Sequence, residues 1–280
     1  MTVKTLVEAL RLEETAPGRY RADNVEFGER GVVFGGQLIG QLLVAGATVD
    51  PSKRVKSAHA LFARPVLVDE PVELRVDVLQ AGKTFASTSA SIWQQSKERA
   101  RAMVLLTLDE RDLIRYGSPM PSVGAPEDAT PSLGNDNVRV VGGADIFGVG
   151  AAGDPSVDVW FRVPGEATTQ PEVQGLLAHS SASFLIGASM RPHEGVGQSA
   201  AHTAFSTGII GHTISFHEPV EAGAWHLLAH RHTYAGRGRV FGHGEIFNDG
   251  GQLVASFSQE AMVRHFPEGV TPEGQESTIL

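Results

Sequence analysis

Apolar and polar residues alternate strictly from Val72 to Val78, which is typical of an antiparallel strand with one buried face. Residues 85–94 and 100–108 read as two further strands, joined by the turn-forming segment 96–98. Residues 19–22 fit a short edge strand. We therefore expect the first half of the chain to form a meander of long antiparallel strands.

A stretch with helical periodicity precedes these strands. From Gln37 onward, Leu38 and Leu42 recur on one stripe, and Gly35 and Gly36 stand where the helix would begin. Glycines at a helix start allow close backbone approach and leave N–H groups directed at a docked ligand. They equally permit tight packing of the helix on the sheet, and both interpretations stay open.

The long β stretch appears a second time at a constant offset of 154 residues. Residues 62–66 (Phe-Ala-Arg-Pro-Val) align with residues 216–220 (Phe-His-Glu-Pro-Val), and 81–83 (Ala-Gly-Lys) align with 235–237 (Ala-Gly-Arg). No gap is needed between these matches. Such long-range self-similarity indicates an internal duplication, with two copies of one fold in one chain.

The second copy has a helix of its own. Residues 169–172 (Thr-Gln-Pro-Glu) form a capping-box pattern with proline in the first turn, and the apolar pattern extends to about Met190. Two strands are expected before it, at 138–141 and 158–163. Four prolines between the halves indicate a linker, so we expect an N-terminal unit at 1–114, a linker at 115–137 and a C-terminal unit at 138–280.

Composition and charge narrow the functional classes. A net charge of −9 makes nucleic acid a poor partner, because phosphate binding needs clustered Lys and Arg. No apolar run approaches the roughly 18 residues of a membrane span. The chain has no cysteine, which excludes thiolate chemistry and agrees with a reducing compartment, and its first residues do not resemble a secretory signal. We therefore expect a cytoplasmic protein.

Three motifs together resemble the acyl-CoA thioesterase II family. They are residues 33–41 (Val-Phe-Gly-Gly-Gln-x-x-Gly-Gln), 59–65 (His-x-x-Phe-x-Arg-Pro) and 253–264 (Leu-Val-Ala-Ser-x-x-Gln-Glu-x-Met-x-Arg). The resemblance covers nearly the whole chain. It implies an α+β double hotdog fold, in which two tandem antiparallel sheets each wrap a helix. It also implies hydrolysis of acyl-CoA without cofactor, metal or covalent intermediate, and it points to a homo-oligomer.

Members of that family hold the attacking water with three side chains: an Asp on the second helix, a Thr or Ser on the next strand, and a Gln on the last strand. The resemblance places Gln259 at the Gln position, although a Gln near a strand end can also be ordinary surface. Ala182 occupies the Asp position and Ile209 the Thr/Ser position. Water attack on a thioester needs a base, and neither of these side chains can accept a proton.

Three nearby residues are candidates to replace the missing groups. His179 lies one helical turn before Ala182 and could act as a base, while Ser181 could orient water. Thr213 is expected on the inward face of its strand, and its counterpart in the first half is His59. Each residue also has a structural interpretation. His179 could hydrogen-bond a backbone carbonyl, Ser181 could allow close packing, and Thr213 could occupy its strand position without a chemical role.

Basic residues are candidates for contacts with the phosphates of CoA. Arg64 lies within the motif at residues 59–65, and Arg237 lies in the hairpin turn 236–239 with Lys83 as its counterpart. With His59 and with Gly35–Gln37 at the helix start, Arg64 and Arg237 form the expected substrate-binding set. A solvated hairpin turn explains Arg237 equally well.

Histidines concentrate in the second half. His226, His230 and His232 share strand parity, and His243 lies across the following turn, an arrangement that can bind zinc. No carboxylate is placed to orient these rings, which metal-binding histidines normally require. We therefore expect no metal here, and a polar interface or a CoA phosphate contact instead.

The favoured function is hydrolysis of acyl-CoA to free acid and CoA by a water that Gln259 and polar neighbours position. The alternative is an acyl-CoA binding protein that has lost hydrolysis. A hydratase on the same fold is a weaker option, because no Asp-x-x-x-x-His motif lies in the helix region.

Overall fold

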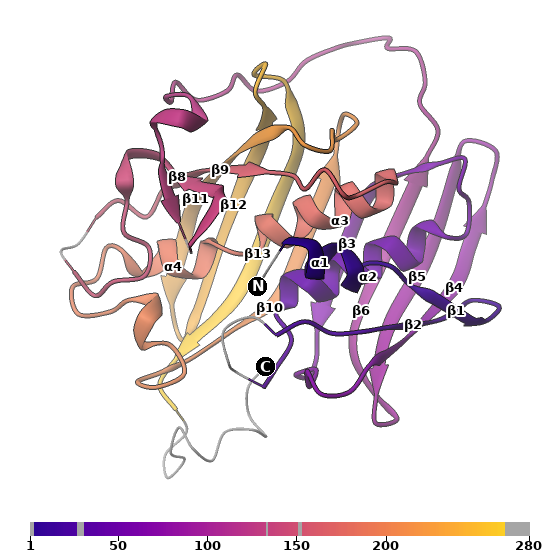
Figure 1. Ribbon diagram of the computed structural model, residues 1–280, viewed down its shortest axis with the longest axis horizontal. Coiled ribbons are helices and arrows are strands. Elements are labelled where there is room, and N and C mark those ends of the chain that lie inside the picture. Colours follow the sequence, from indigo (N-terminus) through magenta and orange to yellow (C-terminus); the bar gives the residue numbers. More distant parts are fainter. Residues whose placement is uncertain (1–2, 27–30, 133, 151–152, 267–280) are drawn as a thin grey trace.

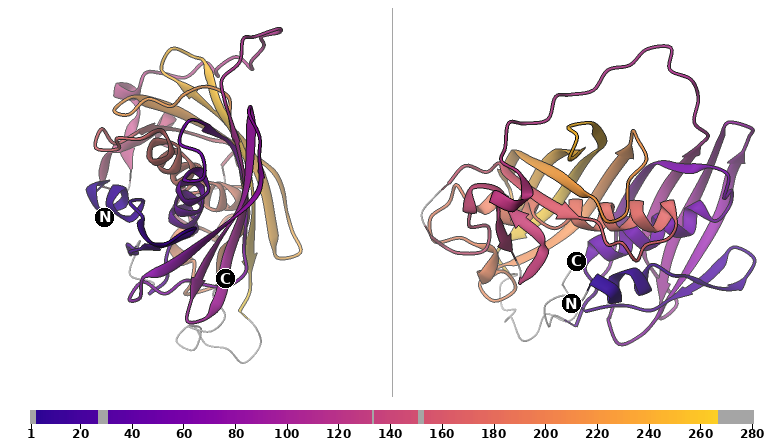
Figure 2. Two further views of the ribbon diagram at one scale, coloured as in Figure 1. Left: turned by 90° about the vertical axis from the view of Figure 1, so that its right-hand side faces the viewer. Right: turned by 45° about the horizontal axis from the view of Figure 1, so that its top comes forward.

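Two helices, α2 (Gly35–Ala47) and α3 (Gln170–Ser181), lie side by side against one face of a single antiparallel sheet (Figure 1). The computed structural model describes residues 3–26, 31–132, 134–150 and 153–266. Viewed from its end, the sheet curves around the helices as one continuous layer (Figure 2). This arrangement confirms the α+β class expected from the sequence.

The described part of the sheet has thirteen strands in the order β1-β2-β4-β5-β6-β3-β10-β13-β12-β11-β9-β8-β7. The first half supplies β1 (Glu13–Ala16), β2 (Arg19–Ala22), β3 (Arg54–Phe62), β4 (Val72–Ala81), β5 (Phe85–Gln94) and β6 (Lys97–Thr107). The second half supplies β7 (Thr130–Ser132), β8 (Asn135–Val140), β9 (Val157–Arg162), β10 (Ser206–Phe216), β11 (Trp225–Gly236), β12 (Arg239–Asn248) and β13 (Leu253–Arg264). The shorter helical segments are α1 (Val3–Ala9), α4 (Leu185–Met190), η1 (Pro126–Asp128), η2 (Val141–Gly143) and η3 (Gln198–Ala200).

The two halves repeat one order of strands from the centre outward. It is β3, β6, β5, β4, β2 in the first half and β10, β13, β12, β11, β9 in the second. β3 and β10 pair antiparallel at the centre, where His59 lies directly opposite Thr213. Because the 154-residue offset relates these two residues, an approximate two-fold axis passes between them. This arrangement is the one that an internal duplication predicts.

Glycines set the distance between α2 and α3. A Cβ added at Gly40 would lie 3.0 Å from the carbonyl oxygen of Gly175, and one added at Gly36 would lie 2.8 Å from that of His179. Both distances are shorter than ordinary contacts, so the helices approach this closely only because a side chain is missing. For Gly36 the structure therefore favours tight packing, against a helix rather than against the sheet.

The second helix is shorter than the sequence pattern predicts. α3 ends at Ser181, and α4 begins only at Leu185. The hydroxyls of Ser181 and Ser183 donate to the carbonyls of Ala178 and His179, at 2.8 and 3.2 Å. Serine side chains that bind preceding carbonyls compete with the helical backbone, which explains the break.

The segment between the halves is more structured than a linker. It arcs away from β6 and crosses to the second half (Figure 1), and the predicted linker range 115–137 contains η1, β7 and the start of β8. Trp160 on β9 donates from Nε1 to the carbonyl of Gly124 at 3.0 Å. Met120 and Val123 pack on the same cluster as Trp160, so this segment covers part of the outer sheet face. None of the described helices could cross a membrane.

Candidate functional site

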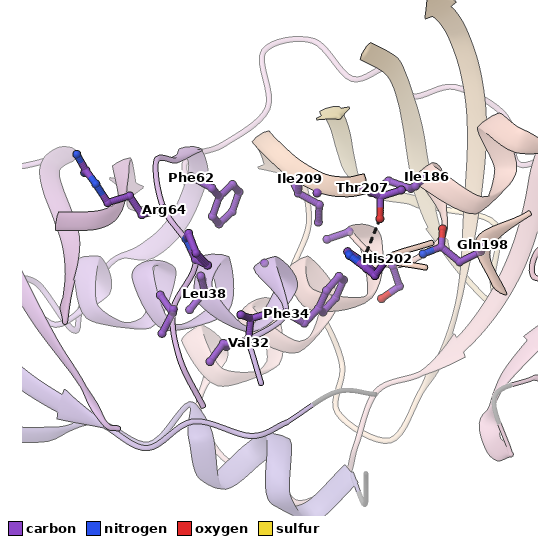
Figure 3. Close-up of a pocket in the computed structure, with 17 residues that line it drawn as sticks. Val32, Phe34, Leu38, Phe62, Arg64, Ile186, Gln198, His202, Thr207 and Ile209 are labelled. Carbon is purple, nitrogen blue, oxygen red and sulfur yellow. Dashed lines mark hydrogen bonds between the residues drawn. The ribbon is translucent and has the colours of Figure 1, made fainter. Parts of the chain in front are cut away.

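A cavity of about 110 Å³ lies between the two halves, where α2 begins and α3 ends (Figure 3). The first half contributes Gly35 and the second half contributes Ala182 to its wall. The apolar part of the wall includes Phe34, Leu38, Phe62, Val66, Ile186 and Ile209. The polar part is formed by Arg64, Ser183, Gln198, His202 and Thr207. Both halves are thus needed to build this cavity.

The two apolar replacements inferred from the sequence both face this space. Ala182 follows the last residue of α3, and Ile209 lies on β10 with 7% of its surface exposed. Neither side chain can hold a proton or a water. The cavity therefore has an apolar surface at the two positions where the resembling family carries an acid and a hydroxyl.

The prediction that Thr213 shares the inward face with Ile209 is wrong. The pairing of β10 with β13 shifts register between Ile209 and Gly211, which is the signature of a β-bulge. One extra residue reverses the alternation, so His212 points inward and Thr213 outward. Thr213 Oγ1 lies 3.3 Å from Nδ1 of His59 on the outer face.

The expected inward position of His59 is wrong for the same reason. In the first half, the pairing of β3 with β6 shifts register between Val55 and Ser57, at the positions equivalent to Ile209 and Gly211. His59 is exposed. The repeated irregularity removes both His59 and Thr213 from the cavity side of the sheet.

The bulge creates a buried chain of three polar side chains. Ser181 Oγ lies 3.0 Å from His212 Nε2, and His212 Nδ1 lies 3.0 Å from Gln259 Oε1. All three side chains are at most 2% exposed. Burial lowers the pKa of His212 to about 4, so its ring is neutral near pH 7. The structure thus brings Ser181 and Gln259 together through a residue that sequence reasoning missed.

One signal in the sequence could have located His212. Gly211 stands inside a predicted strand, and a glycine there often marks a bulge. A bulge at that point predicts the inward direction for His212 instead of Thr213.

His179 is buried beside the start of α2. Its ring meets that of Phe34 edge-on, with 5.2 Å between the ring centroids. Burial lowers the pKa of His179 to about 4, which makes it a weak base near pH 7. His179 is absent from the described residues that line the cavity, whereas Phe34 is among them.

The three residues at the start of α2 have different environments. Gly35 lines the cavity, and Gly36 packs against α3. Gln37 is buried, where its Oε1 accepts from the N–H of Val25 at 3.1 Å and its Nε2 donates to Asn24 Oδ1 at 3.3 Å. Gln37 therefore anchors the preceding segment, and Gly35 alone of the three reaches the cavity.

The two candidate arginines lie at different distances from the cavity. Arg64 lines its rim, donates from Nη1 to the carbonyl of Glu98 at 2.9 Å, and directs its guanidinium away from His202 (Figure 3). Arg237 is exposed in the β11–β12 turn and is not among the described cavity-lining residues. Its backbone φ of 53° lies in the left-handed region, as tight hairpin turns require.

The four histidines of β11 and β12 do not converge. His226 and His230 are buried, and burial lowers the pKa of His230 to about 4. His232 Nε2 lies 2.7 Å from the carbonyl of Leu185, and His243 Nδ1 lies 3.3 Å from Thr233 Oγ1. Within the described ranges, no three His, Asp or Glu side chains come together as a metal site.

Comparison with known proteins gives matches along nearly the whole chain. The model of the acyl-CoA thioesterase N-terminal domain matches residues 25–107, and that of the C-terminal domain matches residues 118–263. Acyl-CoA thioesterase 2 of Haemophilus influenzae is 28% identical over 288 residues, covering 94% of this chain and 98% of that protein. Acyl-coenzyme A thioesterase 8 of Mus musculus is 24% identical, covering 94% and 90%.

Solved structures show the same architecture. An acyl-CoA thioesterase II from Mycobacterium marinum has 27% sequence identity and a TM-score of 0.77, covering 96% of this chain and 100% of that one. A hot dog fold protein from Alicyclobacillus acidocaldarius has 16% identity and a TM-score of 0.75, covering 94% and 98%. The double hotdog fold expected from the sequence is confirmed.

Proposed function

Because the chain belongs to the acyl-CoA thioesterase family, we propose that it hydrolyses acyl-CoA thioesters in the cavity between its two halves. One observation carries the proposal: the start of α2 from one half and the end of α3 from the other enclose the same space. The wall of this space has apolar residues that could contact an acyl chain and polar residues that could contact the reacting group.

The start of α2 is suited to polarise a thioester carbonyl. Phe34 is the N-cap residue, and no side chain caps this end of the helix. The first N–H groups of any helix have no carbonyl one turn earlier to bind, and the helix dipole makes this end electropositive. Gly35 lines the cavity without a side chain, so a carbonyl oxygen can approach its backbone closely.

The acyl chain would lie against the apolar wall. Leu38, Phe62 and Ile209 are each less than 10% exposed and line the cavity. Burying one methylene contributes about 0.8 kcal/mol, so a few methylenes are sufficient for appreciable binding.

Gln259 acts in this proposal as a positioning residue. It holds His212, and His212 holds Ser181, whose next neighbour Ala182 forms the cavity wall. Within the described residues, Gln259 Nε2 is buried without a hydrogen-bond partner and Gln259 is not among those lining the cavity. The water-positioning role expected for Gln259 is thus proposed to operate through the end of α3.

A second function is favoured by Ala182 and Ile209. Apolar walls at these two positions fit a protein that binds acyl-CoA and does not hydrolyse it. Binding needs only the apolar wall and the helix start, whereas hydrolysis also needs a group that accepts the proton of water.

Thiol release from acyl-CoAs of graded chain length separates the two functions. If the protein is a hydrolase, the wild type should release thiol. Ala182→Leu should abolish this turnover by filling the cavity, and Gln259→Ala should reduce it. Ala235→Leu at the exposed end of β11, next to the β11–β12 turn, is the matched control and should leave turnover unchanged. Calorimetric binding of a non-hydrolysable thioether analogue without any thiol release from the corresponding acyl-CoA would favour the binding protein. No binding and no release would contradict both.

A further inference from the structure

A histidine and a threonine face each other inside the cavity wall. Thr207 Oγ1 lies 3.2 Å from His202 Nε2, and both residues line the cavity (Figure 3). They come from different segments of the second half, since His202 lies in the turn before β10 and Thr207 lies on β10 itself. This separation between a hydroxyl and an imidazole nitrogen is typical of a base and the group from which it takes a proton.

Thr207 carries a hydroxyl on the same face of β10 as Ile209. The two residues are two positions apart and precede the bulge, so both side chains point to the inner face. Thr207 is 2% exposed. A hydroxyl therefore stands one inward position before Ile209, in the same cavity.

The backbone holds His202 in an uncommon conformation. Its φ is 68°, in the left-handed region, and its N–H donates to the carbonyl of Phe205 at 2.7 Å. A bridge between Ala201 and Phe205 closes the same turn. Non-glycine residues in this region concentrate at functional sites, where the surrounding structure maintains the strain. Here the strained turn directs the imidazole toward Thr207 and the cavity.

We propose that Thr207 and His202 form the proton-accepting pair of the thioesterase reaction, in place of the carboxylate that is missing at position 182. The proposal rests on the hydrolytic function proposed above. With the imidazole proton on Nδ1, Nε2 accepts from the hydroxyl of Thr207, and that hydroxyl can accept from a water in the cavity.

The proton transfers balance along this pair. As the water oxygen bonds to the thioester carbon, one water proton passes to Thr207 Oγ1 and the hydroxyl proton of Thr207 passes to His202 Nε2. When the carbon–sulfur bond breaks, the departing thiolate takes the proton from the imidazolium. The products are the carboxylic acid and the free thiol of CoA, and both side chains return to their starting state.

Three single variants of the full chain test the pair. Thr207→Val keeps the side-chain shape without the hydroxyl, Thr207→Ser keeps the hydroxyl, and His202→Gln keeps a polar side chain without a base. We expect Thr207→Val and His202→Gln to lower kcat by 100-fold or more, the range of general-base catalysis, with KM changed less than threefold. Thr207→Ser should keep at least a tenth of the wild-type kcat.

Two further readouts separate a catalytic role from a structural one. The acid limb of the wild-type pH–rate profile should disappear in His202→Gln, and all three variants should bind the thioether analogue as tightly as the wild type. If Thr207→Val and His202→Gln keep the kcat of the wild type, the proposed pair is wrong, while the proposed hydrolysis still holds. Trapping of an acyl group on Thr207 by mass spectrometry would also overturn it. Analogue binding without wild-type turnover would overturn the pair together with the proposed hydrolysis.

Discussion

His212 and Gln259 face each other across the β10–β13 pair, with 3.0 Å between Nδ1 and Oε1. His212 reaches Ser181 on its other side, so the three side chains form one buried unit. Side chains in one hydrogen-bond network contribute non-additively to stability, because removal of one leaves the next unpaired.

A double-mutant cycle should therefore show coupling between His212 and Gln259. We expect His212→Ala and Gln259→Ala each to lower the free energy of unfolding, and the double variant to lose about 1 kcal/mol less than the sum. Urea unfolding of the four proteins measures this. Gln94 is a matched control, since it is also buried and the described hydrogen bonds of its side chain go to Leu67 and Glu70 in its own half. Additivity at His212 and Gln259 would show that the contact contributes no coupling.

Buried histidines make stability depend on pH below neutrality. Burial lowers the pKa of His179, His212 and His230 from 6.5 to about 4. The unfolded chain binds a proton at each of these residues below pH 6.5, while the folded chain stays neutral down to about pH 4. The free energy of unfolding is therefore highest, as far as these histidines are concerned, above pH 6.5. It falls as the pH falls toward 4, and at pH 5 it is lower by roughly 2 kcal/mol per histidine.

Removing one of these rings should flatten the dependence. We expect His230→Gln to lose less stability than the wild type between pH 7.5 and pH 5.0, with a difference of about 2 kcal/mol in denaturant unfolding. His59→Gln on the outer face is the matched control and should behave like the wild type. An unchanged pH dependence in His230→Gln would mean that the ring gains its proton in the folded state too.

Patterns in the sequence predict most helices and strands of the fold and some residues of the site. The capping box at residues 169–172 was predicted, and in the structure Thr169 accepts from the N–H of Glu172 while Glu172 accepts from that of Thr169. Such signals are local, because the groups that make them lie within one turn. The constant offset of 154 residues likewise predicted two halves of equal strand order.

The inward or outward direction of residues around Gly211 was not predictable from alternation. One extra residue in β10 exchanged the faces of His212 and Thr213, and the pairing with β13 shows where it lies. His202 was missed for a similar reason. It lies in an irregular turn, and its contact with Thr207 depends on a backbone conformation that sequence periodicity does not encode.

Glycine at the crossing of α2 and α3 should be irreplaceable. A Cβ at Gly40 would lie 2.9 Å from Leu10 Cδ2 and 3.0 Å from the carbonyl oxygen of Gly175, so the helices must separate. We expect Gly40→Ala to destabilise the protein by about 1–3 kcal/mol, despite the higher helix propensity of alanine. Gly165→Ala is the control, because a Cβ there meets no atom within 4 Å. Thermal and urea unfolding of both variants measure the difference, and equal stability would contradict the packing role.

A carboxylate at position 182 should restore the reaction when the proposed base is removed. Ala182 and His202 line the same cavity, so an aspartate at 182 would stand beside the same water. Burial raises the pKa of a carboxyl group toward neutrality, which improves it as a base near pH 7. We expect the double variant Ala182→Asp, His202→Gln to have a kcat at least tenfold higher than that of His202→Gln alone, measured by thiol release.

Ala182→Asn in the same background distinguishes a base from a change of shape. The amide has nearly the same size as the acid and cannot take a proton, so turnover should stay low. The restored activity should also rise with pH through the pKa of the new carboxyl group, unlike the profile set by an imidazole. If Ala182→Asp binds the thioether analogue with unchanged affinity and recovers no turnover, position 182 lies out of reach of the reacting water, and the thioester must bind elsewhere along the cavity.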